Sequence, residues 1–74
     1  MDWIKIGDTL TDVSKYSQFR KNESNFTLGD GVKYYWIESE SGFQIGGFMG
    51  KEDAKANRDL AFKHLQEHLN YTEL

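Results

Sequence analysis

The chain has 74 residues, a net charge of −3 at pH 7 and neither cysteine nor proline, so disulfide bonds and thiolate metal sites are excluded. Its nine basic and twelve acidic residues argue against nonspecific binding to nucleic acid or to anionic lipid. Aromatic residues make up 15% of the chain, which is more than one small core needs, so some rings should be available to a partner.

This length fits a single domain spanning residues 1–74. The first ten residues, MDWIKIGDTL, have neither a basic start nor an apolar run, so they do not resemble a signal peptide. No stretch approaches the length of a transmembrane segment. We therefore expect a cytoplasmic protein that does not associate with membranes.

Residues 3–7, WIKIG, alternate in polarity and predict a short strand. Residues 11–21, TDVSKYSQFRK, fit two structures. Their apolar residues have helical spacing, with Thr11 or Asp12 as a cap, but the last six, YSQFRK, also suit a strand. Residues 25–31, NFTLGDG, predict a short strand closed by a Gly-Asp-Gly turn.

Residues 33–48, KYYWIESESGFQIGGF, predict a β-hairpin because they are rich in aromatic and β-branched residues. A three-residue loop, Glu40 to Gly42, with Gly42 in the left-handed conformation separates the side chains best. The apolar face then consists of Tyr35, Ile37, Phe43 and Ile45. The mixed face consists of Tyr34, Trp36, Glu38 and Gln44. The pair Gly46 and Gly47 predicts a bulge or a close contact between helix and strand.

Residues 51 to 69 predict the chain's one long helix, with Gly50 at its cap and Asn70 at its end. Glu52 and Asp53 occupy the first turn, where carboxylates are favoured. The apolar stripe consists of Ala54, Ala61, Phe62, Leu65 and Leu69. The charged residues, Arg58 among them, are assigned to a solvated face. The predicted fold class is α+β, a small antiparallel sheet of three or more strands with one C-terminal helix packed on one face.

The segment IGGFMGKEDAKANRDLAF, residues 45–62, resembles the end of an AP2-type DNA-binding domain, whose plan the arm-binding domains of phage integrases share. The positions that carry the resemblance are Gly46, Phe48, Glu52, Asp53, Ala54, Asp59 and Ala61. The resemblance implies a three-stranded sheet plus a helix, with the outward face of the sheet docked in the major groove of DNA. The positions implied for that contact are Tyr34, Trp36, Glu38, Gln44, Arg20 and Lys21. The family's set of arginines is missing here, so the fold can carry over without DNA binding.

The same outward residues are the candidate partner-binding site on chemical grounds, because Trp and Tyr dominate protein interfaces. The alternative is that the N-terminal segment covers Tyr34 and Trp36, with Trp3 or Phe19 packing on them. His64 and His68 lie four residues apart on the helix, but no third metal ligand is near in sequence. No catalytic motif is evident, so neither an enzyme nor a cofactor is expected.

Two functions therefore remain open. The first is a non-enzymatic interaction or regulatory protein that binds another protein through its aromatic sheet face, with the loop of residues 22–31 as a further candidate contact, as a phage or mobile-element inhibitor of a host protein would. The second is a DNA-binding regulator of the AP2 or integrase-arm type. Convergence of Arg20, Lys21, Lys33 and Lys5 on the outer face would favour DNA. A homodimer through exposed aromatics also stays open.

Overall fold

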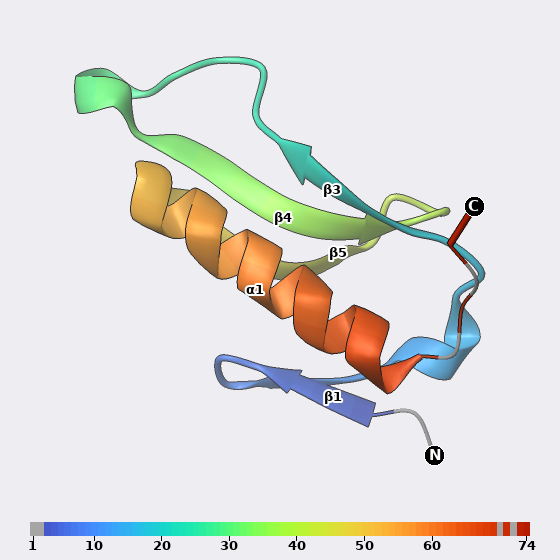
Figure 1. Ribbon diagram of the computed structural model, residues 1–74. Helices are drawn as coiled ribbons and strands as arrows, with labels where there is room; N and C mark the ends of the chain where they lie inside the picture. The colour runs from blue at the N-terminus through green and yellow to red at the C-terminus, as the bar shows by residue number, and fades with distance from the viewer. Residues whose placement is uncertain (1–2, 70, 72) are drawn as a thin grey trace.

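The computed structural model describes residues 3–69, 71 and 73–74 (Figure 1). A first antiparallel sheet pairs β1 (Trp3–Ile6) with β2 (Thr9–Asp12), and a 3-10 turn, η1 (Val13–Lys15), follows it. A second sheet has the order β3-β4-β5, formed by Phe19–Glu23, Lys33–Ser39 and Gln44–Gly50. The helix α1 (Glu52–His68) packs on one face of this sheet. The predicted α+β class, with its single C-terminal helix, is confirmed.

The hairpin of β4 and β5 has the register expected from its loop. Ile37 lies opposite Ile45, and Glu38 lies opposite Gln44. The N–H of Ser39 donates to the carbonyl of Phe43 at 3.0 Å, and Gly42 has a φ of 83°, which glycine adopts without the steric cost of a Cβ. Phe43 is 49% exposed at the end of the expected apolar face, where its ring stacks on Tyr16, which packs against the core cluster.

A β-bulge at Gly46 changes which residues of β5 face the core. Beyond it the register shifts by one residue, so that Trp36 lies opposite Gly47 and Tyr35 opposite Phe48. Gly46 itself has a φ of 73°, as the extra residue of such a bulge often does. Because one residue is inserted, Ile45 and Phe48 both reach the core although they are three positions apart. One of the two structures expected for the Gly-Gly pair is therefore present.

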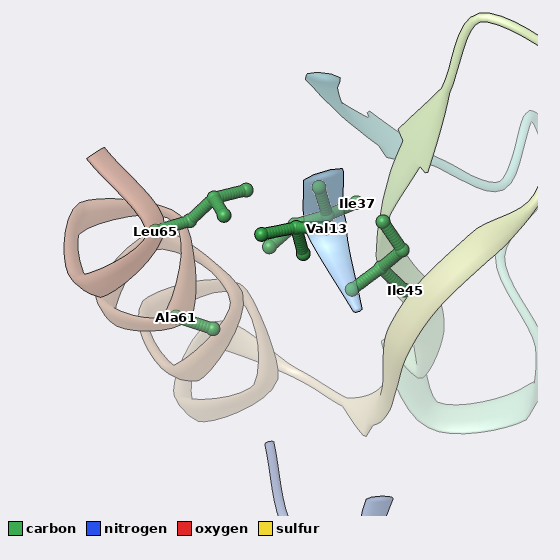
Figure 2. Packing of buried hydrophobic residues seen from close by; sticks show 5 residues of the cluster. All are labelled: Val13, Ile37, Ile45, Ala61 and Leu65. Carbon is green, nitrogen blue, oxygen red and sulfur yellow. The ribbon is translucent and has the colours of Figure 1, made fainter. Parts of the chain in front are cut away.

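The core lies between α1 and the inner face of the β3-β4-β5 sheet (Figure 2). Its buried residues are Val13, Ile37, Ile45, Ala61 and Leu65. Ala54 and Ala61 begin the helix stripe as expected, and Phe62 and Leu69 are only partly buried. The assignment of Arg58 to a solvated face is wrong, since this residue is 5% exposed. Lys51 rather than Gly50 is the residue before the first turn, and Asn70 lies outside the described residues.

Residues 9–31 differ most from expectation. Residues 9–12 form β2, a strand that the sequence did not indicate, and it pairs with β1. Asp12 caps η1 by accepting a hydrogen bond from the N–H of Ser14 at 3.0 Å, so the helical alternative for residues 11–21 shrinks to one short turn. The expected strand at residues 25–31 is wrong. Only an isolated bridge joins Leu28 to Val32 there, around a Gly-Asp-Gly turn in which Asp30 has a φ of 63°.

Candidate functional site

The outer face of the β3-β4-β5 sheet carries five of the six residues that the sequence singles out. Arg20 lies opposite Glu38, and Asn22 lies opposite Trp36. Cross-strand partners share one face of a sheet, and α1 packs on the other (Figure 1). We call these five residues, together with Asn22, the outer row. It consists of Arg20, Asn22, Tyr34, Trp36, Glu38 and Gln44.

From residue 3 onward, the N-terminal segment does not cover the outer row. Ile4, Ile6 and Phe19 pack instead against the core cluster on the helix side of the sheet. Trp3 is 48% exposed. The alternative in which Trp3 or Phe19 packs on Tyr34 and Trp36 is therefore wrong, and both rings stay half-buried on a face without a covering helix among the described residues.

Glu38 organises the outer row. Its carboxylate accepts hydrogen bonds from Trp36 Nε1, Asn22 Nδ2 and Arg20 Nε, each at 2.8 Å, and the residue is only 8% exposed. These bonds, that of Trp36 first, lower the pKa of Glu38 to about 2, because each of them stabilises the ionised form. Glu38 therefore acts as the anchor of its neighbours and presents little free negative charge to a partner.

Tyr34 and Trp36 form an aromatic pair on this face, with ring centroids 5.3 Å apart and planes tilted by 30°. The hydroxyl of Tyr34 donates to Gln44 Oε1 at 3.2 Å. A Cβ at Gly47 would overlap the Tyr34 ring, so the missing side chain is what lets this ring lie across β5. The sequence marks Gly47 only as part of a Gly-Gly pair and gives no signal for this role.

A hollow of about 430 Å³ lies beside the aromatic pair. We call it the aromatic groove. It is lined by Asn22, Asn25, Phe26, Tyr34, Trp36 and Gln44, among others. Ser24 fixes its far wall, because its hydroxyl accepts from the N–H of Tyr34 at 3.2 Å and donates to the carbonyl of Phe26 at 3.0 Å. Phe26, from the loop of residues 22–31, is 64% exposed there.

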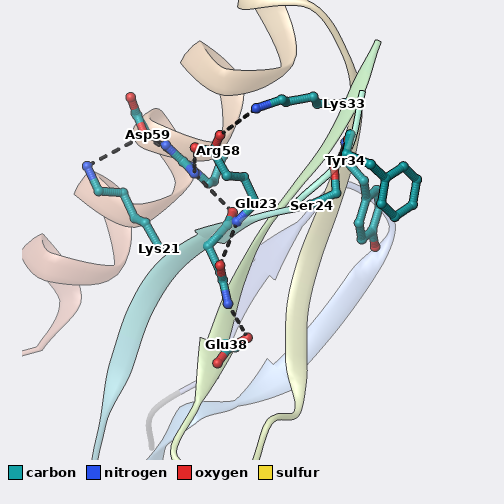
Figure 3. Close-up of polar contacts among 10 residues, drawn as sticks. Lys21, Glu23, Ser24, Lys33, Tyr34, Glu38, Arg58 and Asp59 are labelled. Atoms are coloured by element: carbon teal, nitrogen blue, oxygen red, sulfur yellow. Dashed lines mark hydrogen bonds and ion pairs between the residues drawn. The ribbon is translucent and has the colours of Figure 1, made fainter. Parts of the chain in front are cut away.

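The placement of Lys21 in the outer contact set is wrong. Lys21 lies opposite Ile37 on the inner face, where its ammonium is 3.6 Å from Asp59 Oδ1 and 5.6 Å from the centroid of the Phe62 ring. Successive residues of a strand point to opposite faces, so Arg20 and Lys21 cannot both point outward. Figure 3 shows Lys21 beside α1 and Tyr34 on the other side of the sheet.

Basic residues do not converge on the outer face. The Nζ of Lys33 is 3.2 Å from Glu23 Oε2, and Lys5 belongs to the separate β1–β2 sheet. Of the four cations whose convergence would indicate DNA binding, Arg20 alone lies in the outer row, and it is paired with Glu38. The outer row and its groove are thus close to electrically neutral.

Arg58 joins the helix to the edge strand on the inner side (Figure 3). Its Nη1 donates to the carbonyl of Asn22 at 3.0 Å and its Nη2 to Asp59 Oδ1 at 2.9 Å. The guanidinium also lies 5.2 Å from the centroid of the Tyr35 ring. Arg58 holds the pKa of Asp59 below its usual range by hydrogen bonding. This cluster is structural, because it holds β3 in place under the outer row.

The described residues offer few groups for chemistry. Within this part of the chain, no three His, Cys, Asp or Glu side chains lie close enough together to hold a metal ion. A second hollow, of about 410 Å³, lies between η1 and the end of α1, and its lining includes Val13, Tyr16, Phe62, Leu65 and Leu69. None of the described residues that line it has an acidic, basic or histidine side chain. Nor is any helix in the described range long and apolar enough to cross a membrane.

A comparison of the chain with protein families, curated proteins and solved structures found no match. The resemblance of residues 45–62 to AP2-type domains therefore stays a prediction. Within the described structure, the outer row combines an anchored aromatic pair with an adjacent hollow.

Proposed function

We propose that this chain is a small non-enzymatic protein-binding domain that holds another protein against the outer row. The observation that carries this proposal is an aromatic pair, Tyr34 and Trp36, fixed in place on a sheet face that lacks a covering helix in the described structure. Trp and Tyr supply most of the strong anchors of protein interfaces. Side chains already held in one conformation lose less entropy on binding.

The electrostatics of the face support a protein partner over DNA. Affinity for DNA comes largely from cations that neutralise phosphates, whereas Arg20 is engaged by Glu38 and Lys21 and Lys33 are paired elsewhere. A neutral aromatic centre with a polar rim is the usual anatomy of a protein interface. A regulator or inhibitor that acts by occupying its partner fits these features.

Selection of peptides from a random display library against the immobilised protein tests this proposal without knowledge of the natural partner. We expect selected peptides to shift the amide resonances of the outer row in NMR spectra. Trp36→Ala should weaken their binding by about 2 kcal/mol or more, roughly 30-fold in Kd, and leave the fold intact because the indole lies outside the core cluster.

Leu10→Ala is the control, since Leu10 is an exposed apolar residue, at 64%, on strand β2 of the separate sheet. Binders that tolerate Trp36→Ala and lose affinity with Leu10→Ala would contradict the proposal. A parallel titration with mixed-sequence duplex DNA should give no shifts at low salt. Shifts on the outer row that weaken steeply with salt would instead support the DNA-binding alternative.

A further inference from the structure

The hydrogen-bonding groups around the aromatic groove are mostly used within the protein. Trp36 Nε1 donates to Glu38, and the hydroxyl of Tyr34 donates to Gln44. Asn22 is engaged at both ends of its amide, because Nδ2 donates to Glu38 and Oδ1 accepts from the N–H of Glu23. The Ser24 hydroxyl both accepts and donates. The groove therefore offers ring surfaces and few free polar atoms.

The polar group that Gln44 leaves for a ligand is a donor. Its Oε1 accepts from Tyr34, so its Nε2 hydrogens point away from that bond, and the residue is exposed at the rim. The exposed amide of Asn25 lies on the loop side of the same groove. A ligand that brings acceptors and few donors matches this arrangement. A saccharide would bring many hydroxyl donors that find few acceptors here.

The charges around the groove point the same way. Glu38 is neutralised by Arg20, and the carboxylate of Glu23 is held by Lys33 on the inner side. A single-stranded nucleic acid could stack its bases on the rings, but such sites add a cationic track for the phosphates. The described residues that line the groove form no such track, which favours an uncharged occupant.

We propose that the aromatic groove binds a proline-rich segment of the partner in the polyproline II conformation. Proline residues carry carbonyl acceptors without an N–H donor, and their rings pack on flat aromatic faces such as those of Tyr34 and Trp36. The polyproline II helix is already ordered before binding, which suits a small groove with little area to offset an entropy loss. This inference rests on the proposed function, because it names the chemistry of the segment that the outer row holds.

An NMR titration with decaproline, blocked at both ends, tests the inference. We expect saturable shifts of the Trp36 indole and Gln44 side-chain amide resonances, and none with a blocked Gly-Ser peptide of equal length. Tyr34→Ala and Trp36→Ala should each weaken decaproline binding tenfold or more, and Leu10→Ala should leave it unchanged. Both variants are made because, if one of them fails to fold, the other still tests the inference.

Absence of saturable shifts with decaproline, or shifts that survive in a folded ring variant, would overturn the inference. The peptide selection described above separates its failure from that of the proposed function. Selected peptides that bind the outer row, depend on Trp36 and lack proline would leave the protein-binding function standing and the proline inference refuted. Selected peptides that bind elsewhere would remove both.

Discussion

The two faces of the β3-β4-β5 sheet are built on different physical principles. On the inner face Ile37 and Ile45 are at most 1% exposed and are held by close packing against the helix. On the outer face Glu38 is held by hydrogen bonds from three side chains, those of Arg20, Asn22 and Trp36, at the centre of a half-buried aromatic row. Strand β4 supplies both faces by alternation. Changes of volume or polarity on the inner side should therefore unfold the molecule, whereas changes on the outer side should alter binding and spare the fold.

The largest effect is expected at the inner seam. Ala61 is 9% exposed within the core cluster, so Ala61→Asp buries a charge without a partner. The cost should be several kcal/mol, comparable to the whole stability of a small domain. Thermal unfolding followed by circular dichroism should show loss of the folded state. The neighbour Leu60 is 52% exposed, and Leu60→Asp should melt near wild type. Equal melting of the two variants would contradict the assigned helix face.

A smaller loss of stability is expected at Arg58, which links the helix to strand β3. Arg58→Met keeps the buried stem of the side chain but removes the donor to the Asn22 carbonyl. Leaving such a group without its partner should cost about 1–3 kcal/mol, measured by urea unfolding. Lys55→Met is the control, since Lys55 is exposed on the same helix. If Arg58→Met were as stable as the control, the arginine would not hold β3 to the helix.

Glu38 on the outer face should make the free energy of unfolding depend on pH. The folded pKa of Glu38 is about 2, below the ordinary 4.5, so its ionised form favours folding. This contribution is present above about pH 4.5 and is lost as the pH falls towards 2. Glu38→Gln should be less stable than wild type at pH 7, and its stability should fall less on acidification to about pH 3.

Part of the acid sensitivity should survive in the Glu38→Gln variant. The pKa of Glu40 is also lowered, because its carboxylate accepts hydrogen bonds from the N–H groups of Ser17 and Gln18 and from the Ser17 hydroxyl. Glu40→Gln therefore serves as the comparison, since it removes a carboxylate whose pKa is also lowered but which is not part of the outer row. Parallel stability–pH curves for wild type and Glu38→Gln would show that Glu38 is not the anchor of the outer row.

The smallest change in stability is expected at Gly47. Gly47→Ala displaces the Tyr34 ring, but the ring can turn into solvent, so the free energy of unfolding should stay within about 1 kcal/mol of wild type. The near-ultraviolet circular dichroism of the aromatic pair should change, and binding at the aromatic groove should weaken. At Gly29 an added Cβ meets nothing within 4 Å, so Gly29→Ala should leave both signals unaltered. An unaltered spectrum for Gly47→Ala would mean that the ring does not depend on this glycine.

The features predicted correctly depend on local rules. The hairpin register followed from the alternation in residues 33–48 and from a glycine suited to a positive φ at position 42. The helix and its first-turn carboxylates followed from periodicity and from the helix dipole. The outer placement of Tyr34, Trp36, Glu38 and Gln44 came from the same alternation, so most of the candidate row was accessible from sequence.

The errors arose where a residue's type was weighed above its position or where partners are distant in sequence. Arg58 lies between Ala54 and Ala61 on the buried stripe, and only its charge suggested solvent. Lys21 was grouped with Arg20 although adjacent strand residues must diverge. The role of Glu38 depends on Arg20 and Asn22, which are 18 and 16 positions away. No periodicity could reveal that donors from three side chains meet at one carboxylate.

The separate β1–β2 sheet has a consequence for how the molecule opens. It shares no ladder with β3-β4-β5 in the described structure, and two strands alone are marginally stable in water. Its attachment depends mainly on Ile4 and Ile6 against the core. We therefore expect the β1–β2 hairpin to be a cooperative unit of its own that detaches at a free energy below that of global unfolding. Its amide hydrogens should exchange with solvent through this detachment, while those of β4 should exchange only through global unfolding.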